Sequence, residues 1–92
     1  MKSIIFRSRA ERDLLEIVDY FSDYSPRTAV KVLDDIYRSI DQLAYFPHSG
    51  RPVEGQEFRR LVTIKYHFVI GYAVTADAVT IIGIYRYQDR EV

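Results

Sequence analysis

Apolar residues recur at helical spacing in two stretches of the first half of the chain. In each stretch most of them are three or four positions apart, with polar residues between them. This spacing places the apolar side chains on one face of an α-helix. The sequence therefore predicts two amphipathic helices, with apolar faces formed by Ala10, Leu14, Ile17, Val18 and Phe21 in the first and by Ala29, Leu33, Ile36, Ile40 and Leu43 in the second.

Capping residues indicate where these helices begin and end. Ser8 followed by Glu11 has the pattern of a capping box, in which each side chain accepts a backbone N–H near the helix start. Ser25 followed by Pro26 predicts the second start, because proline suits the first helical position. Pro47 ends the second helix. Few residues separate the two helices, so we expect an antiparallel hairpin.

The remaining segments are rich in Val, Ile, Tyr and Phe, which favour strands. A short strand is expected over Lys2–Phe6, before the first helix. Residues 47–57 contain two Pro and two Gly and are expected to be a loop. Three further strands are predicted over Phe58–Ile64, Tyr66–Val74 and Val79–Tyr85.

Short turns connect these three strands. Lys65 marks a tight turn or bulge after the first, and residues 75–78 form a hairpin turn after the second. In the middle strand Tyr66, Phe68, Ile70, Tyr72 and Val74 share one face, and His67, Val69, Gly71 and Ala73 share the other. The second face is less polar than a solvated face should be. The sheet is therefore expected to carry helices on one side and a partner or ligand on the other.

The predicted order of elements is β-α-α-β-β-β. Strands joined by short turns form an antiparallel meander, and the first strand is expected to pair with it because an isolated strand is not stable. The helical hairpin then covers one face of the sheet. The expected fold class is α+β, a two-layer arrangement in a single domain spanning residues 1–92.

The chain has no net charge, but its charges are distributed unevenly. It holds 13 basic and 13 acidic side chains, with +3 in residues 1–12, −4 in residues 13–41 and +1 in residues 42–92. The acidic pair Asp34 and Asp35 is expected on the solvated side of the second helix. Arg outnumbers Lys by ten to three and there are eight Tyr, and these two residue types are enriched at protein interfaces.

The sequence contains no strong enzymatic signature. It has no phosphate-binding Gly-rich loop, no metal-ligand cluster and no cysteine, and its two histidines are far apart in sequence, so no metal or cofactor is expected. No targeting segment is expected, and the sequence has no apolar run of about 20 residues. The expected location is the cytoplasm, without membrane association.

Basic and aromatic residues in the predicted sheet are the candidates for function. Arg59 and Arg60 are adjacent on a strand, so they are expected to point to opposite faces. Arg60, His67, Arg86 and Tyr87 could bind RNA phosphate and support attack by a ribose 2′-hydroxyl. The alternative is that such residues form the edge of a protein-binding surface.

An ordered signature runs along nearly the whole chain. It consists of residues 10–17 with Tyr20, Ser25 and Pro26 with Ala29, the apolar residues Ile36, Ile40 and Leu43, and residues 46–52, 59–62, 66–74 and 81–89. This pattern closely resembles the RelE/ParE superfamily of toxins from bacterial type II toxin–antitoxin modules. The resemblance implies a cognate antitoxin whose C-terminal segment wraps the toxin, and contact with operator DNA only through that antitoxin.

The superfamily divides by target, and this chain resembles the ParE-like branch, which inhibits DNA gyrase. Residues 47–52 and Arg59–Val62 are ParE-like, and His67 stands where RelE-like nucleases often carry Arg. Arg86, between Tyr85 and Tyr87, stands where many ParE-like chains carry His, which is a departure from that branch.

We therefore expect a toxin that inhibits DNA gyrase by binding, without chemistry of its own. The resemblance leaves two alternatives. In a RelE-like nuclease, which cleaves mRNA on the ribosome, the Arg60 and Arg86 side chains would hold the phosphate and His67 or Tyr87 would transfer protons. An inactive module would keep only the antitoxin-binding surface. The expected partner-binding residues are Arg51, Arg59, Tyr85, Arg86 and Tyr87.

Overall fold

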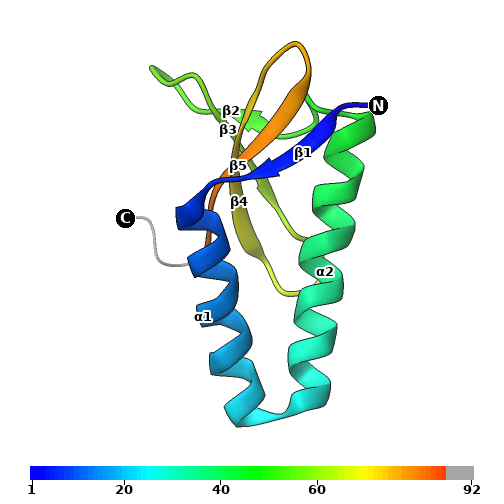
Figure 1. The fold of residues 1–92 in the computed structure, drawn as a ribbon, viewed down its shortest axis with the longest axis vertical. Helices are drawn as coiled ribbons and strands as arrows, with labels where there is room; N and C mark the ends of the chain where they lie inside the picture. Colours follow the sequence, from blue (N-terminus) through cyan, green and yellow to red (C-terminus); the bar gives the residue numbers. More distant parts are fainter. Residues whose placement is uncertain (87–92) are drawn as a thin grey trace.

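The computed structural model describes residues 1–86, which form a layer of two helices and a mixed sheet (Figure 1). The order of elements agrees with the predicted α+β fold apart from one additional short strand. The elements are β1 (Ser3–Phe6), α1 (Ser8–Tyr24), α2 (Pro26–Tyr45), β2 (Arg51–Pro52), β3 (Arg59–Val62), β4 (Phe68–Val74) and β5 (Ala78–Arg86).

The sheet has five strands in the order β1-β5-β4-β3-β2. Strands β3, β4 and β5 form the predicted antiparallel meander. Strand β1 pairs with it, as predicted, and the structure places it parallel to β5. Strand β2 lies within the segment predicted as a loop and pairs with β3 through Arg51 and Pro52. Two residues are too few to give an alternating pattern, so this strand could not be recognised in the sequence.

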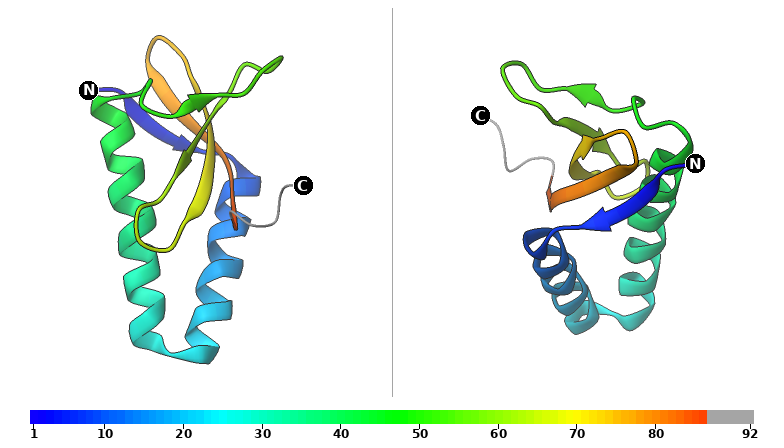
Figure 2. Two further views of the ribbon diagram at one scale, coloured as in Figure 1. Left: turned by 180° about the vertical axis from the view of Figure 1, so that it is seen from behind. Right: turned by 45° about the horizontal axis from the view of Figure 1, so that its top comes forward.

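Both helices lie on the same side of the sheet (Figures 1 and 2). The core between the layers comes mainly from α2, β4 and β5, whereas Ala10 is the one fully buried residue of α1. The other apolar residues of α1 are half-buried or exposed, so α1 covers the margin of the sheet. The buried core consists of Ala10, Val32, Ile36, Ile40, Leu43, Phe68, Ile70, Tyr72, Val79, Ile81 and Ile84.

A β-bulge changes which residues of β5 face the core. Gly71 of β4 lies opposite Gly83, but the next residue, Tyr72, lies opposite Ile81, so Ile82 is an extra residue on β5. The bulge shifts the alternation by one position. As a result Ile81 and Ile84, three positions apart, both pack in the core.

The start of α1 differs from the prediction, whereas the start of α2 agrees with it. Arg7, not Ser8, is the N-cap of α1, and no side chain caps this end, so the predicted capping box is wrong. The backbone N–H of Arg7 donates to the carbonyl of Ile81, 3.0 Å away, which keeps Arg7 extended against β5. Ser25 caps α2 by accepting from the N–H of Thr28 at 3.3 Å, and Pro26 follows it.

Asp35 was predicted to be solvated and is instead buried, with 5% of its surface exposed. Its carboxylate accepts the backbone N–H of Lys65 at 3.2 Å and that of Tyr66 at 2.8 Å. It therefore fixes the predicted turn between β3 and β4 to α2. The preceding residue, Asp34, is exposed as predicted and pairs with Arg38 one turn along the helix.

Candidate functional site

Hydrogen bonds from one side chain of β3 and one of β4 hold the loop before β2 in place. The Tyr72 hydroxyl accepts the N–H of Gly50 at 2.8 Å and donates to the carbonyl of Pro47 at 2.9 Å. The guanidinium of Arg59 donates to the carbonyl of Gly50 at 2.8 Å. These bonds fix the position of Arg51, the first residue of β2.

Because the Tyr72 hydroxyl is buried and hydrogen-bonded, the free energy of unfolding should fall as the pH becomes alkaline. Burial raises its pKa, although the Gly50 hydrogen bond and the charge of Arg59 oppose the shift. The folded pKa therefore lies above the unfolded value of about 10. The stabilising contribution is present below that value and is lost as the pH rises through the folded pKa.

We expect Tyr72→Phe to lower the free energy of unfolding by about 1–2 kcal/mol at neutral pH, because both hydrogen bonds are lost. The difference from the wild type should shrink above about pH 10, as the unfolded phenol ionises. Urea denaturation of both proteins at several pH values measures this difference. A difference that stays constant into the alkaline range would contradict the prediction.

The strand register defines the face of the sheet turned away from the helices, here called the outer face. The pairings place Arg51, Arg60, Gly71 and Gly83 in one row across four strands. The neighbouring row on the same face consists of Val62, Val69 and Tyr85. Arg51, Arg60, Val62 and Tyr85 are exposed on this face.

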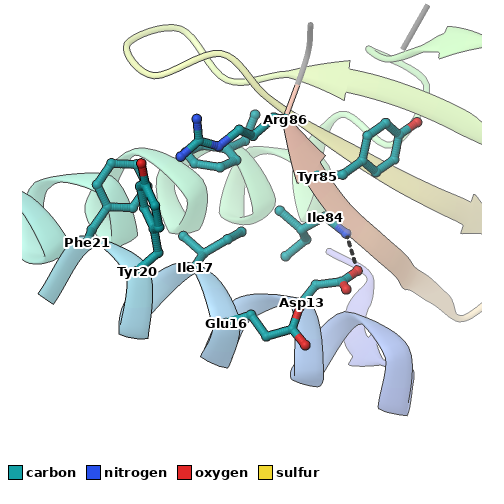
Figure 3. A pocket seen from close by; sticks show the side chains of 9 residues that line it. Asp13, Glu16, Ile17, Tyr20, Phe21, Ile84, Tyr85 and Arg86 are labelled. Atoms are coloured by element: carbon teal, nitrogen blue, oxygen red, sulfur yellow. Dashed lines mark hydrogen bonds between the residues drawn. The ribbon is translucent and has the colours of Figure 1, made fainter. Parts of the chain in front are cut away.

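Arg59 and Arg86 lie on the opposite face, toward the helices. Arg59 is paired with Tyr72, a core residue, which confirms that Arg59 and Arg60 point to opposite faces. Arg86 is paired with Phe68, and its guanidinium carbon lies 4.8 Å from the ring centre of Tyr20 on α1 (Figure 3). Arg86 thus makes a cation–π contact that ties the end of β5 to α1.

The four residues of the nuclease prediction are not brought to one face. Arg60 is on the outer face, whereas Arg86 is on the helix side. His67 was predicted to lie on a strand and is instead exposed in the turn before β4, with a φ of 58°. A left-handed residue at this position allows the chain to reverse after the tight turn. Tyr87 lies outside the described residues.

A groove of about 530 Å³ lies between α1 and the end of β5 (Figure 3). Strand β1 ends at Phe6, opposite Ile81, so it does not cover the last residues of β5. Here Asp13 takes the place of a neighbouring strand, because its carboxylate accepts the N–H of Ile84 at 3.0 Å. The groove is lined by Asp13, Glu16, Ile17, Tyr20, Phe21, Phe68, Ile84, Tyr85 and Arg86.

None of the site residues predicted from the sequence lies on the α1 side of this groove. Asp13 and Ile84 are 71 positions apart, so no local pattern connects them. The sequence did contain one indication that Asp13 faces the sheet. Asp13 lies between Ala10 and Ile17 at helical spacing, beside the apolar face of α1. A carboxylate at such a position needs hydrogen-bond donors from the layer against which the helix packs.

Residues 1–86 lack two features that would indicate other functions. They contain no group of three or more His, Cys, Asp or Glu that could hold a metal ion. None of the helices in this range is long and apolar enough to cross a membrane. His48 and His67 are both exposed, on different loops.

Comparisons with known proteins agree with one another. Residues 4–90 match the family model described as the ParE toxin of the type II toxin–antitoxin system parDE. The candidate toxin Y4kP of Sinorhizobium fredii is 32% identical over 87 residues, which cover 95% of this chain and 91% of that protein. A solved structure of the chromosomal ParDE toxin–antitoxin system from P. aeruginosa has a TM-score of 0.81 and 27% identity, covering 94% of this chain and 96% of that one.

Proposed function

The chain belongs to the ParE toxin family of type II toxin–antitoxin systems, and we propose that it inhibits DNA gyrase by direct binding and is neutralised by a cognate antitoxin. The observation that carries the proposal is the match to the ParE family over residues 4–90. On this proposal the toxin binds its target in the cytoplasm and carries out no chemistry. Operator DNA is contacted only through the antitoxin.

The positions of the arginines support binding over RNA cleavage. A nuclease site needs several groups around one phosphate. Arg60 and Arg86 lie on opposite faces of the sheet, and Arg86 is engaged with Tyr20. The ribosome and mRNA are therefore the less favoured targets.

The groove between α1 and β5 is the surface that we assign to the antitoxin. It combines carboxylates, an exposed Tyr20 and the uncovered end of β5. An extended or helical segment that is disordered alone could fold onto such a groove. Tyr85 and Arg86, both predicted to bind a partner, line it.

The proposal is tested by a gyrase supercoiling assay with the purified chain, with and without its antitoxin. We expect inhibition of supercoiling that is relieved when antitoxin is added. The same preparation is added to a ribosome-programmed mRNA cleavage assay as a comparison. Folded toxin that leaves gyrase active at several-fold excess would contradict the proposal. Cleavage of mRNA would then identify the nuclease alternative, and no effect in either assay would identify an inactive module.

A further inference from the structure

The charges of this protein are segregated between its two layers. The two helices hold eight acidic and five basic residues, a net charge of −3. The five strands hold four charged residues, and all four are arginine: Arg51, Arg59, Arg60 and Arg86. The sheet is therefore the layer of the described chain that would attract an acidic partner.

Two of these arginines are already used within the fold. The guanidinium of Arg59 is bonded to the loop before β2, and that of Arg86 lies over the rings of Tyr20 and Phe21. Arg51 and Arg60 differ from them in being exposed on the outer face. Neither forms an ion pair with another residue in the range 1–86. They are the sheet arginines left to bind a partner.

Arg51 and Arg60 lie directly opposite each other on neighbouring strands. Like charges in this position destabilise a sheet, so the pair has a cost within the free protein. An anionic group placed between the two guanidinium groups would remove that cost. Guanidinium groups bind carboxylate and phosphate oxygens through paired hydrogen bonds.

The surroundings of this pair favour a protein partner. Gly71 follows Arg60 in the same row, and a Cβ there would meet no atom closer than 3.8 Å, although Gly71 itself is buried. In the neighbouring row Val62 is 39% exposed and Tyr85 is 40% exposed. Val69, between them, is only 3% exposed, so Val62 is the exposed aliphatic residue of this row. Arginine and tyrosine beside an exposed apolar residue are typical of protein interfaces. Two guanidinium groups alone would neutralise only about two phosphates of a nucleic acid.

We infer that the outer face, centred on Arg51 and Arg60 with Val62 and Tyr85 beside them, docks onto a carboxylate-rich surface of gyrase. This inference rests on the proposed function and adds the face and the chemistry of the contact. It places the target on the sheet side, whereas the groove assigned to the antitoxin lies against α1. Tyr85 belongs to both surfaces, so the two partners would meet at the end of β5.

The test is a charge reversal of the pair, Arg51→Glu with Arg60→Glu. Its matched control is Arg27→Glu with Lys31→Glu, which makes the same change of charge at exposed positions of α2. Binding to DNA-free gyrase and inhibition of supercoiling are measured for both. We expect the reversal to weaken binding and inhibition at least tenfold, and the control to stay within about twofold of the wild type. Wild-type binding should also weaken with added salt.

Each of the following results would overturn the inference, and they can be told apart. A reversal variant that inhibits as well as the wild type contradicts the docking face alone. A wild-type chain that neither binds nor inhibits gyrase contradicts the proposed function as well. A wild type that binds DNA but not DNA-free gyrase, and loses DNA binding on the charge reversal, would show that the outer face binds nucleic acid instead. If the reversal variant fails to fold, Arg51→Gln with Arg60→Gln serves instead, since it removes the repulsion between the two arginines without adding new charge. A Gln variant as active as the wild type would overturn the inference.

Discussion

Replacing Gly50 with alanine is expected to lower the free energy of unfolding by about 3–4 kcal/mol, because the site cannot hold a side chain. A Cβ at Gly50 would collide with the hydroxyl of Tyr72 and would lie 2.8 Å from the carbonyl oxygen of Arg60. Neither group can move easily. Tyr72 is fully buried, and the backbone of Arg60 belongs to the ladder between β2, β3 and β4. The change would also break the bond from the Gly50 N–H to Tyr72.

Gly55→Ala is the matched control for this prediction. Gly55 has no atom within 4 Å of a Cβ position, but its φ is +79°. Its replacement should cost about 1–2 kcal/mol, from backbone strain alone. Urea denaturation followed by circular dichroism measures both variants. Equal losses at the two glycines would show that the Gly50 loop shifts to accept a methyl group, which the contacts of Tyr72 and Arg60 argue against.

Asp35→Ala is expected to lower the free energy of unfolding by about 2–3 kcal/mol. The carboxylate of Asp35 accepts the backbone N–H groups of Lys65 and Tyr66, and no other side chain in the described chain bonds to these two donors. Hydrogen bonds to a charged acceptor are stronger than neutral ones. Without them the turn between β3 and β4 would detach from α2, so amide exchange at residues 65 and 66 should accelerate most.

Asp34→Ala is the control, because Asp34 precedes Asp35 and differs from it in exposure. Its carboxylate pairs with Arg38 at the helix surface, where both side chains are more than half exposed. Such pairs contribute little to stability, so the unfolding free energy should be nearly unchanged. Asp35→Asn should fall between the two, since one oxygen acceptor remains and the charge is lost. Similar losses for Asp34→Ala and Asp35→Ala would contradict a role for the buried carboxylate.

The functional predictions depend on the sheet, and the sequence could predict only part of it. That Arg59 and Arg60 face opposite ways follows from the two-residue period of a strand. The relation between Arg60 and Arg86 depends on how β3, β4 and β5 are paired, and the pairing places them on opposite faces. The β-bulge at Ile82 breaks the alternation along β5, so residues at its end could not be assigned to a face by counting.

Local patterns in the sequence determined the two helices, the Ser25 cap, three of the later strands and the position of their turns. Each depends on residues within a few positions of one another, through spacing, capping and turn geometry. The ordered signature along the chain also identified the toxin superfamily and favoured the branch that the family match confirms.

Tertiary structure alone decided the features that join distant residues. The parallel pairing of β1 with β5, the burial of Asp35 beneath a turn 30 positions away, and the bond from Ile84 to Asp13 all connect segments that no local pattern relates. Whether a carboxylate is solvated or buried depends on which backbone donors the fold brings to it. The physical reason is that hydrogen bonding and burial depend on distance in space, whereas sequence periodicity reports only the direction in which each side chain leaves its own element.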